Sequence, residues 1–376
     1  MTEATQAPLR VAAVGCGVVW RHHLQAVLEM QPRLISYSAV VEPDALRRAA
    51  ALKALDGQGA PARSFATLME AIEADPDRTL FEAVDIMVPN VGNLHEHVAR
   101  EAQNAGRHVL LEKPISVCIA SGERILQAQP PEKVLMVAEN AQYWREVLLV
   151  QRLIHQGQLG DLLSVRAKCW ESAHPALNEW AADGSYDAGS FIADAAEGFV
   201  FDSGLHWLRP LRMFLGKAVR VSAVAGRSLL QMRGPSMTQA LICFESGVTA
   251  IFEAILAPGA ISEQPFFCIQ GTKAEVQIDG FAGGARLFTI QDGKMIEEDL
   301  NGEFSGAIGW DTGYAGEMLD FAQAVLHQKT PEAGAAEALE DLRLMLALMK
   351  AAKSGQWEDV DQVDSLLSME ALQLEL

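Results

Sequence analysis

The sequence predicts an α/β protein, with a doubly wound parallel sheet at the N-terminus and an α+β region with an antiparallel sheet after it. In the first 140 residues, short apolar runs without polar alternation are separated by amphipathic stretches, as is typical of strands covered by helices on both faces. Between residues 220 and 290, strand-like runs follow one another across short turns, as in an antiparallel sheet. The pattern changes near residue 140, so we expect two domains, residues 1–140 and residues 141–376.

The expected elements of the first domain alternate between strand and helix. The strands are Arg10–Val14, Leu34–Val41, Ala83–Val88, His108–Glu112 and Val134–Ala138, and the helices lie near residues 20–30, 44–55, 67–73, 94–105 and 119–128. The second domain is expected to contain a helix at Glu146–Gln156, a strand at Leu163–Glu171, six strands within residues 220–290, and helices near 313–327 and 335–353. Whether the last helices pack back on the first domain is left open.

Composition and charge restrict the class of function. The 376 residues carry a formal net charge of −19, from 30 Lys+Arg against 49 Asp+Glu. This charge favours solubility and disfavours nucleic acid as a partner, because a negative field repels phosphate. No apolar run is long enough to span a bilayer, and the N-terminus lacks a secretory pattern, so we expect no membrane partner. The five cysteines are scattered without a Cys-x-x-Cys pair, which favours reduced thiols in a cytoplasmic protein and no metal site.

The first expected strand ends in Gly15-Cys16-Gly17, which predicts a dinucleotide-binding turn. The first glycine permits a tight turn, and the second leaves room for a pyrophosphate at the N-terminus of the next helix. Gly-x-Gly alone is a weak signal, since such pairs are common in ordinary turns. Trp20 stands where a third glycine is usual, and we expect its indole either to line the cofactor cleft or to fill space beneath a neighbouring loop. The candidate pyrophosphate contacts are Gly15, Gly17, Val18 and Val19.

An acid at the end of the second strand supports this hypothesis. Glu42 lies 22 residues after Trp20, close to the spacing of about 20 residues at which a carboxylate binds the ribose hydroxyls of the adenosine. The alternative is a solvent-facing acid ahead of a helix-starting proline. Because a carboxylate at this position repels the 2′-phosphate of NADP, we expect NAD as the cofactor and NADP as the less favoured one. Arg47 and Arg48 could hold a phosphate, although on a helix face they are more often solvated.

Two further strand ends reach the edge of the sheet where ligands bind. Glu112, Lys113 and Pro114 follow the fifth strand, and ligands of open α/β sheets bind at the carboxyl ends of strands. The Lys113 ammonium could polarise a substrate oxygen there and lower the pKa of a nearby base, whereas a surface lysine in a loop is the alternative. Pro89 and Asn90 end the fourth strand, and together with Glu112 we expect them near the nicotinamide side of the cofactor.

With these motifs the chain resembles the family of oxidoreductases typified by glucose–fructose oxidoreductase, inositol dehydrogenase and MocA. The resemblance extends over nearly the whole chain and is carried by VGCG, AVVEPD, VDIMVPN with a later His95, AGRHVLLEKPIS, LIHQGQLGDLLSVRA, FDSGLHWLRPLRMFLG and CFESGVTAIFE. It implies an N-terminal Rossmann domain and a C-terminal domain with a large open, mostly antiparallel sheet that builds homodimers or homotetramers. It also implies NAD- or NADP-linked oxidation or reduction of a carbinol carbon in a sugar, cyclitol or related polyhydroxylated compound.

The stretch FDSGLHWLRPL supplies a candidate catalytic pair. If a helix begins here, a spacing of four residues places Asp202 and His206 on one face. A neutral histidine suits removal of a hydroxyl proton near pH 7, with Asp202 orienting the ring or holding a substrate hydroxyl. A half-buried histidine with a local acidic partner is the alternative. The resemblance assigns Asp202 and His206 as the catalytic pair, with Lys113 completing the site.

The chain departs from the family pattern at several positions. Arg209 stands where relatives often have an acid: facing the site it would favour an acidic or phosphorylated substrate, and a surface arginine is the alternative. Gln142 stands where many relatives carry an arginine, and Pro210 predicts a kink in its helix. Residues 172–201 differ most from the pattern, and we expect them to form part of the substrate pocket.

Four further polar residues are weaker candidates. Asn140 and Tyr143 follow the sixth strand near the expected domain junction, where a substrate contact would be favourable. His95 and His97 fall in the helix after the fourth strand, and we expect both on the helix surface.

Three functions are compatible with these motifs. The leading hypothesis is a cytoplasmic NAD-linked dehydrogenase or reductase acting on a polyhydroxylated ring. One alternative is an NAD-dependent glycoside-cleaving enzyme that oxidises, eliminates and reduces within one cycle. The other is a non-catalytic NAD-binding regulator, against which the joint presence of Lys113, Asp202 and His206 argues.

Overall fold

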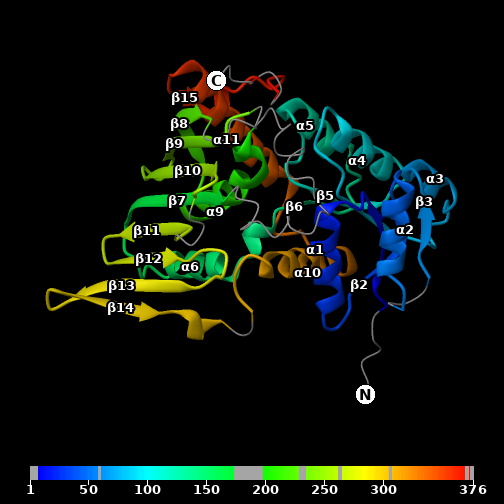
Figure 1. Cartoon of the computed structure of the whole chain (residues 1–376), viewed down its shortest axis with the longest axis horizontal. Coiled ribbons are helices and arrows are strands. Elements are labelled where there is room, and N and C mark those ends of the chain that lie inside the picture. Colours follow the sequence, from blue (N-terminus) through cyan, green and yellow to red (C-terminus); the bar gives the residue numbers. More distant parts are fainter. Residues whose placement is uncertain are drawn as a thin grey trace. The chain divides into compact units, whose positions relative to one another are not determined.

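The computed structural model describes residues 7–57, 61–172, 198–227, 234–260, 265–304 and 307–368, together with Leu372. The chain forms two compact units, which Figure 1 colours by sequence position. The first contains Met1–Glu139 and Tyr314–Leu339, and the second contains Asn140–Gly313 and Glu340–Leu376. Among the described residues, no helix has both the length and the apolar character that crossing a bilayer requires.

The first unit is built on a six-stranded parallel sheet (Figure 1). Its order is β3-β2-β1-β4-β5-β6, and every neighbouring pair runs parallel. The strand order reverses between β1 and β4, which is where open α/β sheets bind ligands. The predicted doubly wound fold is therefore confirmed. The strands are β1 (Leu9–Val14), β2 (Ile35–Val41), β3 (Arg63–Phe65), β4 (Ala83–Ile86), β5 (His108–Glu112) and β6 (Leu135–Ala138).

The central strands are apolar on both faces, which explains why helices must cover the sheet. β1, β4 and β5 are buried along almost their whole lengths, and a strand of that kind is stable only between two layers. Figure 1 shows these helices around the sheet. They are α1 (Val18–Glu29), α2 (Ala45–Ala54), α3 (Leu68–Glu73), α4 (Leu94–Asn104), α5 (Ile119–Ala128) and α10 (Thr312–His327).

The segment after α10 returns to this sheet. The N–H of Val137 donates to the carbonyl oxygen of Ala333 at 3.3 Å, and Met136 forms an isolated bridge with Gly334. These contacts partly cover the outer edge of β6, which would otherwise offer unpaired backbone groups.

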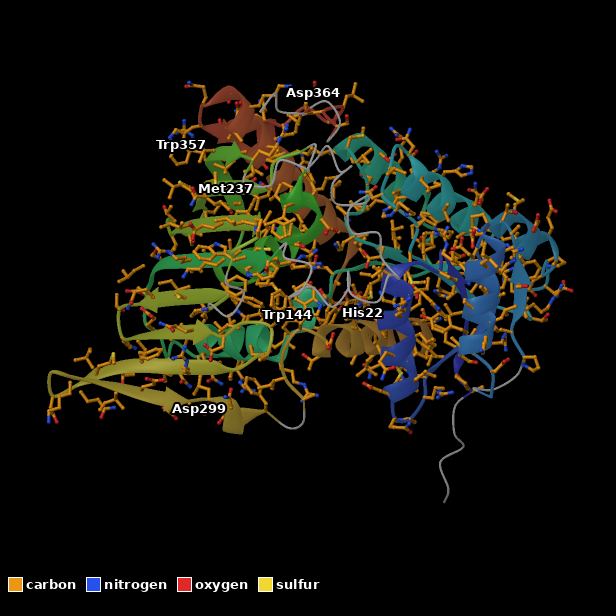
Figure 2. All side chains as sticks on the ribbon, in the orientation of Figure 1. His22, Trp144, Met237, Asp299, Trp357 and Asp364 are labelled. Atoms are coloured by element: carbon orange, nitrogen blue, oxygen red, sulfur yellow. The ribbon has the colours of Figure 1, made fainter. Side chains whose placement is uncertain are left out.

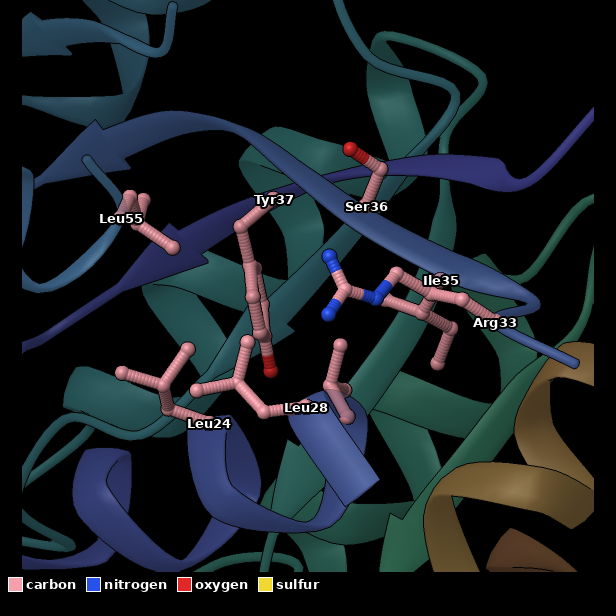
Figure 3. Close-up of a pocket in the computed structure, with 8 residues that line it drawn as sticks. Leu24, Leu28, Arg33, Ile35, Ser36, Tyr37 and Leu55 are labelled. Carbon is pink, nitrogen blue, oxygen red and sulfur yellow. The ribbon is translucent and has the colours of Figure 1, made fainter. Parts of the chain in front are cut away.

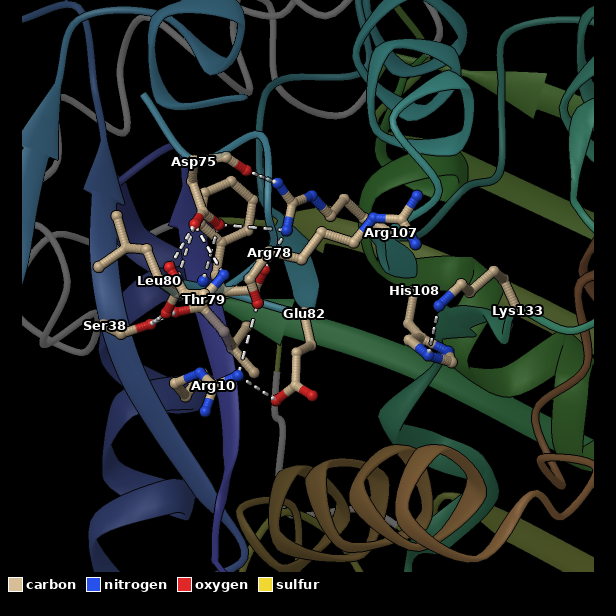
Figure 4. A network of polar contacts seen from close by, with 12 residues as sticks. Arg10, Ser38, Asp75, Arg78, Thr79, Leu80, Glu82, Arg107, His108 and Lys133 are labelled. Carbon is tan, nitrogen blue, oxygen red and sulfur yellow. Dashed lines mark hydrogen bonds and ion pairs between the residues drawn. The ribbon is translucent and has the colours of Figure 1, made fainter. Parts of the chain in front are cut away.

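The loop before β4 is held by one buried carboxylate (Figure 4). Asp75 accepts from the backbone N–H groups of Thr79 and Leu80, both at 2.8 Å, and pairs with Arg107 at 3.2 Å. The Arg107 guanidinium also lies over the ring of Phe81, 4.3 Å from its centroid. These partners offset the free-energy cost of burying the Arg107 guanidinium, because an unpaired buried charge is costly. The network fixes the start of β4, and the sequence analysis did not predict it.

The second unit is built on a nine-stranded mixed sheet. The order is β14-β13-β12-β11-β7-β10-β9-β8-β15, in which β7 and β10 pair parallel and all other neighbours pair antiparallel. The expected open and mostly antiparallel sheet is confirmed. The strands are β7 (Leu162–Ser172), β8 (Ala218–Gly226), β9 (Met237–Phe244), β10 (Thr249–Ala257), β11 (Phe267–Gly271), β12 (Ala274–Ile278), β13 (Ala285–Gln291), β14 (Lys294–Asp299) and β15 (Glu358–Asp359).

Burial alternates along the central strands of this sheet, so one face is covered and the other is more exposed. Helix α9 contacts β7, and α6 contacts β12. The helical segments are η1 (Asn140–Tyr143), α6 (Arg145–His155), η2 (Val200–Gly204), α9 (Leu205–Leu215), η3 (Asn301–Glu303), α11 (Ala335–Ser354) and η4 (Val360–Gln362).

Three strands were missed by the sequence analysis. β3 has only three residues, two of them exposed, and β15 has only two. β14 is exposed at every position, so its pattern KMIEED carries no alternation to reveal it. Most of the stretch 172–201, expected in the substrate pocket, lies outside the described residues.

Candidate functional site

The turn after β1 requires glycine at its first position. Gly15 has a φ of +87° and its N–H donates to the carbonyl oxygen of Val41 at 2.8 Å. A Cβ added at Gly15 would lie 2.9 Å from the carbonyl oxygen of Met87, which follows β4. Backbone conformation and steric contact therefore both exclude a side chain, and the turn brings the ends of β1 and β4 together.

The second glycine leaves an open space at the start of α1. A Cβ added at Gly17 would meet no atom within 4 Å, and no side chain caps the helix. No acidic residue occupies the first turn of the helix, which begins with Val18 and Val19. The N–H groups and the positive end of the helix are thus available to an anion such as a pyrophosphate.

Glu42 lies at the end of β2 and faces this turn. One carboxylate oxygen accepts from the N–H of Cys16 at 2.8 Å, and the other accepts from the N–H of Asp44 at 3.0 Å. Arg47 forms an ion pair with the same carboxylate at 3.3 Å. Glu42 is only 3% exposed, so the alternative of a solvent-facing acid is wrong.

Trp20 fills space in the core of the first unit and does not line an open cleft. Its indole is buried and meets the ring of Tyr37 edge-on, with 4.8 Å between centroids.

Figure 3 looks into the small space beside Tyr37, which measures about 10 Å³. A space of this size holds at most a single water, so it is not a substrate site.

The loop after β4 carries an amide with no internal partner. Pro89 is exposed, and the buried side-chain oxygen and nitrogen of Asn90 have no hydrogen-bond partner among the described residues. Buried amides are normally bonded, so an unsatisfied one indicates a group that a ligand can complete. This fits the expected position of Asn90 beside the cofactor.

His95 corrects the expectation that it lies on the helix surface. The ring is 1% exposed, and its two nitrogens lie 2.9 Å from the carbonyl oxygens of Val88 and Pro114. Burial lowers the pKa of His95 below its usual value. The ring therefore ties the loop after β4 to the loop after β5. His97 does lie on the surface, with a side chain that is 69% exposed.

The end of β5 places an acid in the interior and a lysine beside it. Glu112 is buried, and burial raises its pKa to about 7. Lys113 is half-buried and is followed by a cis peptide bond to Pro114. The nearby ammonium of Lys113 and imidazole of His23 favour the ionised form of Glu112. A carboxyl group with this pKa changes charge near neutral pH.

In the second unit, the candidate substrate residues lie in the short helix η1. Asn140 is buried, and its amide oxygen and nitrogen have no hydrogen-bond partner within the described part of the chain. Tyr143 is 8% exposed. As with Asn90, the unsatisfied amide is a polar group that a ligand can complete.

The candidate catalytic pair sits where a π-helical turn joins an α-helix. Asp202 lies within η2, a π-helix, and His206 lies in the first turn of α9. The α-helical spacing used to place both residues on one face does not apply across this wider turn, and π-turns are frequent at functional sites. His206 is 5% exposed, and its ring meets Trp310 edge-on at 5.0 Å.

Trp310, which meets His206, belongs to an aromatic cluster in the second unit. Trp144, which Figure 2 labels, lies 5.1 Å from Trp310 and 5.6 Å from Trp207 between ring centroids. Behind it, Glu146 accepts from the N–H groups of Gly284 at 3.0 Å and Gly309 at 2.8 Å. The sequence analysis missed this arrangement, because residues 284 and 309 are far from residue 146 in the chain.

Arg209 is not a surface arginine, which corrects that alternative. It is 2% exposed and pairs with Asp341 of α11, its Nε lying 2.6 Å from Oδ2. Its Nη1 donates to Oε1 of Gln142 at 2.7 Å. Arg212 shares the same carboxylate of Asp341 at 2.5 Å. Pro210 lies within α9, which continues to Leu215.

A parallel sheet whose order reverses beside an open glycine turn defines a dinucleotide-binding protein. Comparison with known proteins gives the family. The N-terminal model of the GFO/IDH/MocA family, described as an oxidoreductase family with an NAD-binding Rossmann fold, matches residues 9–139, and the model of its C-terminal domain matches residues 147–277. The chain belongs to this family, as the motifs predicted, and its first unit contains the NAD-binding Rossmann domain.

The individual relatives share a third or less of their aligned residues with this chain. Inositol 2-dehydrogenase of Corynebacterium glutamicum is 32% identical over 160 residues, which are 42% of this chain and 44% of the relative. The chain thus spans less than half the length of that relative. D-apiose dehydrogenase of Paraburkholderia graminis is 25% identical over 76% of this chain and 69% of the relative.

Solved structures share the whole fold. Levoglucosan dehydrogenase in complex with NADH and levoglucosan has a TM-score of 0.79 at 20% identity, covering 95% of this chain and 100% of that one. An oxidoreductase from Agrobacterium radiobacter in complex with NAD+, L-tartaric acid and magnesium has a TM-score of 0.76 at 18% identity, covering 94% and 99%. At this identity the likeness shows the fold alone.

Proposed function

We propose that this protein is an NAD-dependent dehydrogenase or reductase that acts on a CH–OH group of a sugar, a cyclitol or a related polyhydroxylated compound. The observation that carries the proposal is the position of Lys113, at the carboxyl end of β5 in the same parallel sheet as the glycine turn. Family relatives named inositol 2-dehydrogenase and D-apiose dehydrogenase support the class of substrate.

The cofactor is assigned to the residues of the first unit whose geometry fits it. Gly15 and Gly17 would admit the pyrophosphate at the start of α1, and Glu42 would face the adenosine ribose and disfavour NADP. The unsatisfied amide of Asn90 would complete its hydrogen bonds on the nicotinamide side. The full set of proposed cofactor contacts is Gly15, Gly17, Val18, Val19, Glu42, Pro89, Asn90, Glu112 and Lys113.

Three side chains are proposed to act on the substrate. NAD supplies the hydride acceptor when bound. His206 accepts the proton of the hydroxyl group, Asp202 orients the imidazole, and the ammonium of Lys113 stabilises the oxygen as its negative charge develops. In the direction of reduction, His206 returns the proton to the same oxygen.

The substrate contacts are proposed within η1 and its surroundings. Asn140 offers an unsatisfied amide, and Tyr143 offers a hydroxyl. Arg209 is not assigned to an anionic substrate, because its guanidinium already pairs with the carboxylate of Asp341. Its proposed role is to hold η1 and α9 together through Gln142.

The remaining assignments are also proposals. Residues 1–140 would form the cofactor domain, and residues 141–376 the domain for substrate and oligomer formation. Exposed apolar side chains on the second sheet, Leu163 (56%), Val224 (60%) and Leu241 (43%), support a homodimer or homotetramer built through that sheet. A cytoplasmic location agrees with five free cysteines.

The proposal is tested by NADH absorbance during incubation with a panel of sugars, cyclitols and uronates, with NADP in parallel. Lys113→Ala should reduce kcat by about a hundredfold or more, the scale of a lost acid–base or electrostatic group, with a much smaller loss of NAD affinity, because Lys113 is only one of the nine proposed cofactor contacts. An unchanged kcat in that variant would remove Lys113 from the mechanism. Net hydrolysis of a glycoside without net NADH would indicate the glycoside-cleaving alternative, and tight NAD binding without any turnover would indicate a regulator.

A further inference from the structure

A buried polar cluster in the first unit has no part in the mechanism above. Its centre is His23, which is fully buried in α1, one turn and a half after the glycine turn. The side chains that face it come from four other elements, namely Tyr37 of β2, Asp85 of β4, Glu112 of β5, and Tyr314 and Glu317 of α10.

One side of the His23 ring faces Asp85, and both carboxyl oxygens of Asp85 have hydrogen-bond partners. Its Nδ1 lies 3.1 Å and 3.0 Å from the two oxygens of Asp85, and the hydroxyl of Tyr37 donates to one of these oxygens at 2.6 Å. Since the phenol donates, Asp85 is an acceptor in this contact, and the Nδ1 that faces both of its oxygens is placed to donate a hydrogen to it.

The other side of the ring faces two further carboxyl groups. Nε2 lies 3.5 Å from Oε1 of Glu317 and 4.0 Å from Oε1 of Glu112. Neither distance makes a hydrogen bond, and Nε2 has no hydrogen-bond partner among the described residues. Both carboxyl groups are buried, with Glu317 1% and Glu112 7% exposed.

Electrostatics favour a charged ring in this position. A buried carboxylate is costly unless a cation lies near it, and His23 is the shared neighbour of Asp85, Glu112 and Glu317. Although burial alone would lower it, the pKa of His23 is raised to about 9 by Asp85 and then by the two glutamates. Burial raises the pKa of Glu317 well above its usual value, which favours the neutral form of that group. The groups whose charges act on Glu112 are Lys113, His23, Glu139 and Asp85.

We propose that His23 is a positioning residue for the reaction, the buried cation that keeps the Glu112 carboxyl ionised behind Lys113. The inference rests on the proposed function, because it concerns the lysine assigned there to the substrate oxygen. The ionised carboxylate in turn holds the neighbouring lysine as a cation, which is the form that stabilises a developing oxyanion. His23 thus acts through Glu112 and touches neither substrate nor cofactor.

The first test compares the pH profiles of kcat in His23→Gln and in the matched control His22→Gln. His22 (Figure 2) precedes His23 on α1 and stacks on Tyr314 at 4.8 Å, so its replacement perturbs the same helix and the same tyrosine while keeping His23, Asp85, Glu112 and Glu317. The acid limb of kcat should lie near pH 7 in the wild type. Loss of a cation about 4 Å away should move the limb upward by about one pH unit in His23→Gln, with KM for NAD unchanged. His22→Gln should not move it.

A second measurement needs no turnover. The imidazole signals of the wild-type protein are followed by NMR from pH 6 to pH 10, with the signal missing in His23→Gln assigned to His23. The proposal requires an imidazolium at pH 8. The proposal is overturned if the His23 ring is neutral at pH 8. It is also overturned if the acid limb of kcat stays at the same pH in His23→Gln. Failure of the proposed function looks different, because then the wild type itself shows no NADH formation.

Discussion

Gln142 and Arg209 are joined by a hydrogen bond of 2.7 Å between Oε1 and Nη1, which links η1 to α9 in the second unit. Both positions depart from the family pattern that the motifs imply. Gln142 stands where that pattern has an arginine, and Arg209 stands where it has an acid. In this chain the cation of the contact stands at Arg209 and the neutral amide at Gln142. Asp341 supplies the carboxylate that the pair then needs.

Removing the Asp341 carboxylate should destabilise the second unit strongly. Asp341→Asn removes the carboxylate that pairs with the buried Arg209 and is shared by Arg212, and loss of one partner of a buried pair costs about 3–5 kcal/mol. The pair Arg220–Asp359 is the control, because its atoms lie 3.7 Å apart and both side chains are about half exposed. Asp359→Asn should change the free energy of unfolding by about 1 kcal/mol or less. Urea unfolding of both variants measures the difference, and equal losses would contradict this account.

The two glycines of the turn should respond differently to substitution. Gly17→Val places its side chain in open space, so stability should be kept while NAD binding is lost. Gly15→Ala forces a side chain against the Met87 carbonyl at a φ of +87°, and should cost about 1–3 kcal/mol of stability. Calorimetric titration with NAD and thermal unfolding separate the effects. Tight NAD binding by Gly17→Val would place the pyrophosphate elsewhere.

The charge of Glu42 should govern the choice between NAD and NADP. Glu42→Gln removes the charge and keeps an oxygen that can accept from Cys16 N–H. Because like charges brought together cost several kcal/mol, kcat/KM for NADP relative to NAD should rise by about tenfold or more. The ratio is measured with one substrate and both cofactors. An unchanged ratio would show that Glu42 serves the turn alone.

The buried histidine predicts a specific dependence of stability on pH. The pKa of His23 is raised from 6.5 to about 9, so its stabilisation is fully present below pH 6.5 and is lost as the pH rises through 9. The loss should be about 3 kcal/mol at most, and His23→Gln should lack it. Glu112 changes stability in the same direction, but between pH 4.5 and about 7. Urea unfolding of both proteins at pH 6, 7.5 and 9 therefore isolates the His23 contribution.

The parallel sheet and the glycine turn could be predicted because their signals are local. Buried strands are apolar along their length, and a glycine with positive φ marks the turn after β1. The parallel pairing of β7 and β10 could not be predicted, since it joins strands that are far apart in sequence.

The site could be predicted less completely than the first sheet, because its contacts also join residues that are far apart in the sequence. His95 and Arg209 are polar residue types whose burial depends on partners distant in the chain, Pro114 for one and Asp341 for the other. His23 gave no signal of its own, because its carboxyl partners converge only in the folded sheet and in α10. The motifs predicted which residue types lie at the strand ends. They did not predict which of these residues contact one another.

The most direct test of the central claim is a crystal structure of the protein with NAD and a polyol that it oxidises. The account predicts that the nicotinamide ring lies beside Lys113 and Asn90, with the reacting carbinol oxygen within hydrogen-bond distance of Lys113 and His206. A nicotinamide bound far from Lys113, or a carbinol group that contacts neither of these two residues, would contradict it.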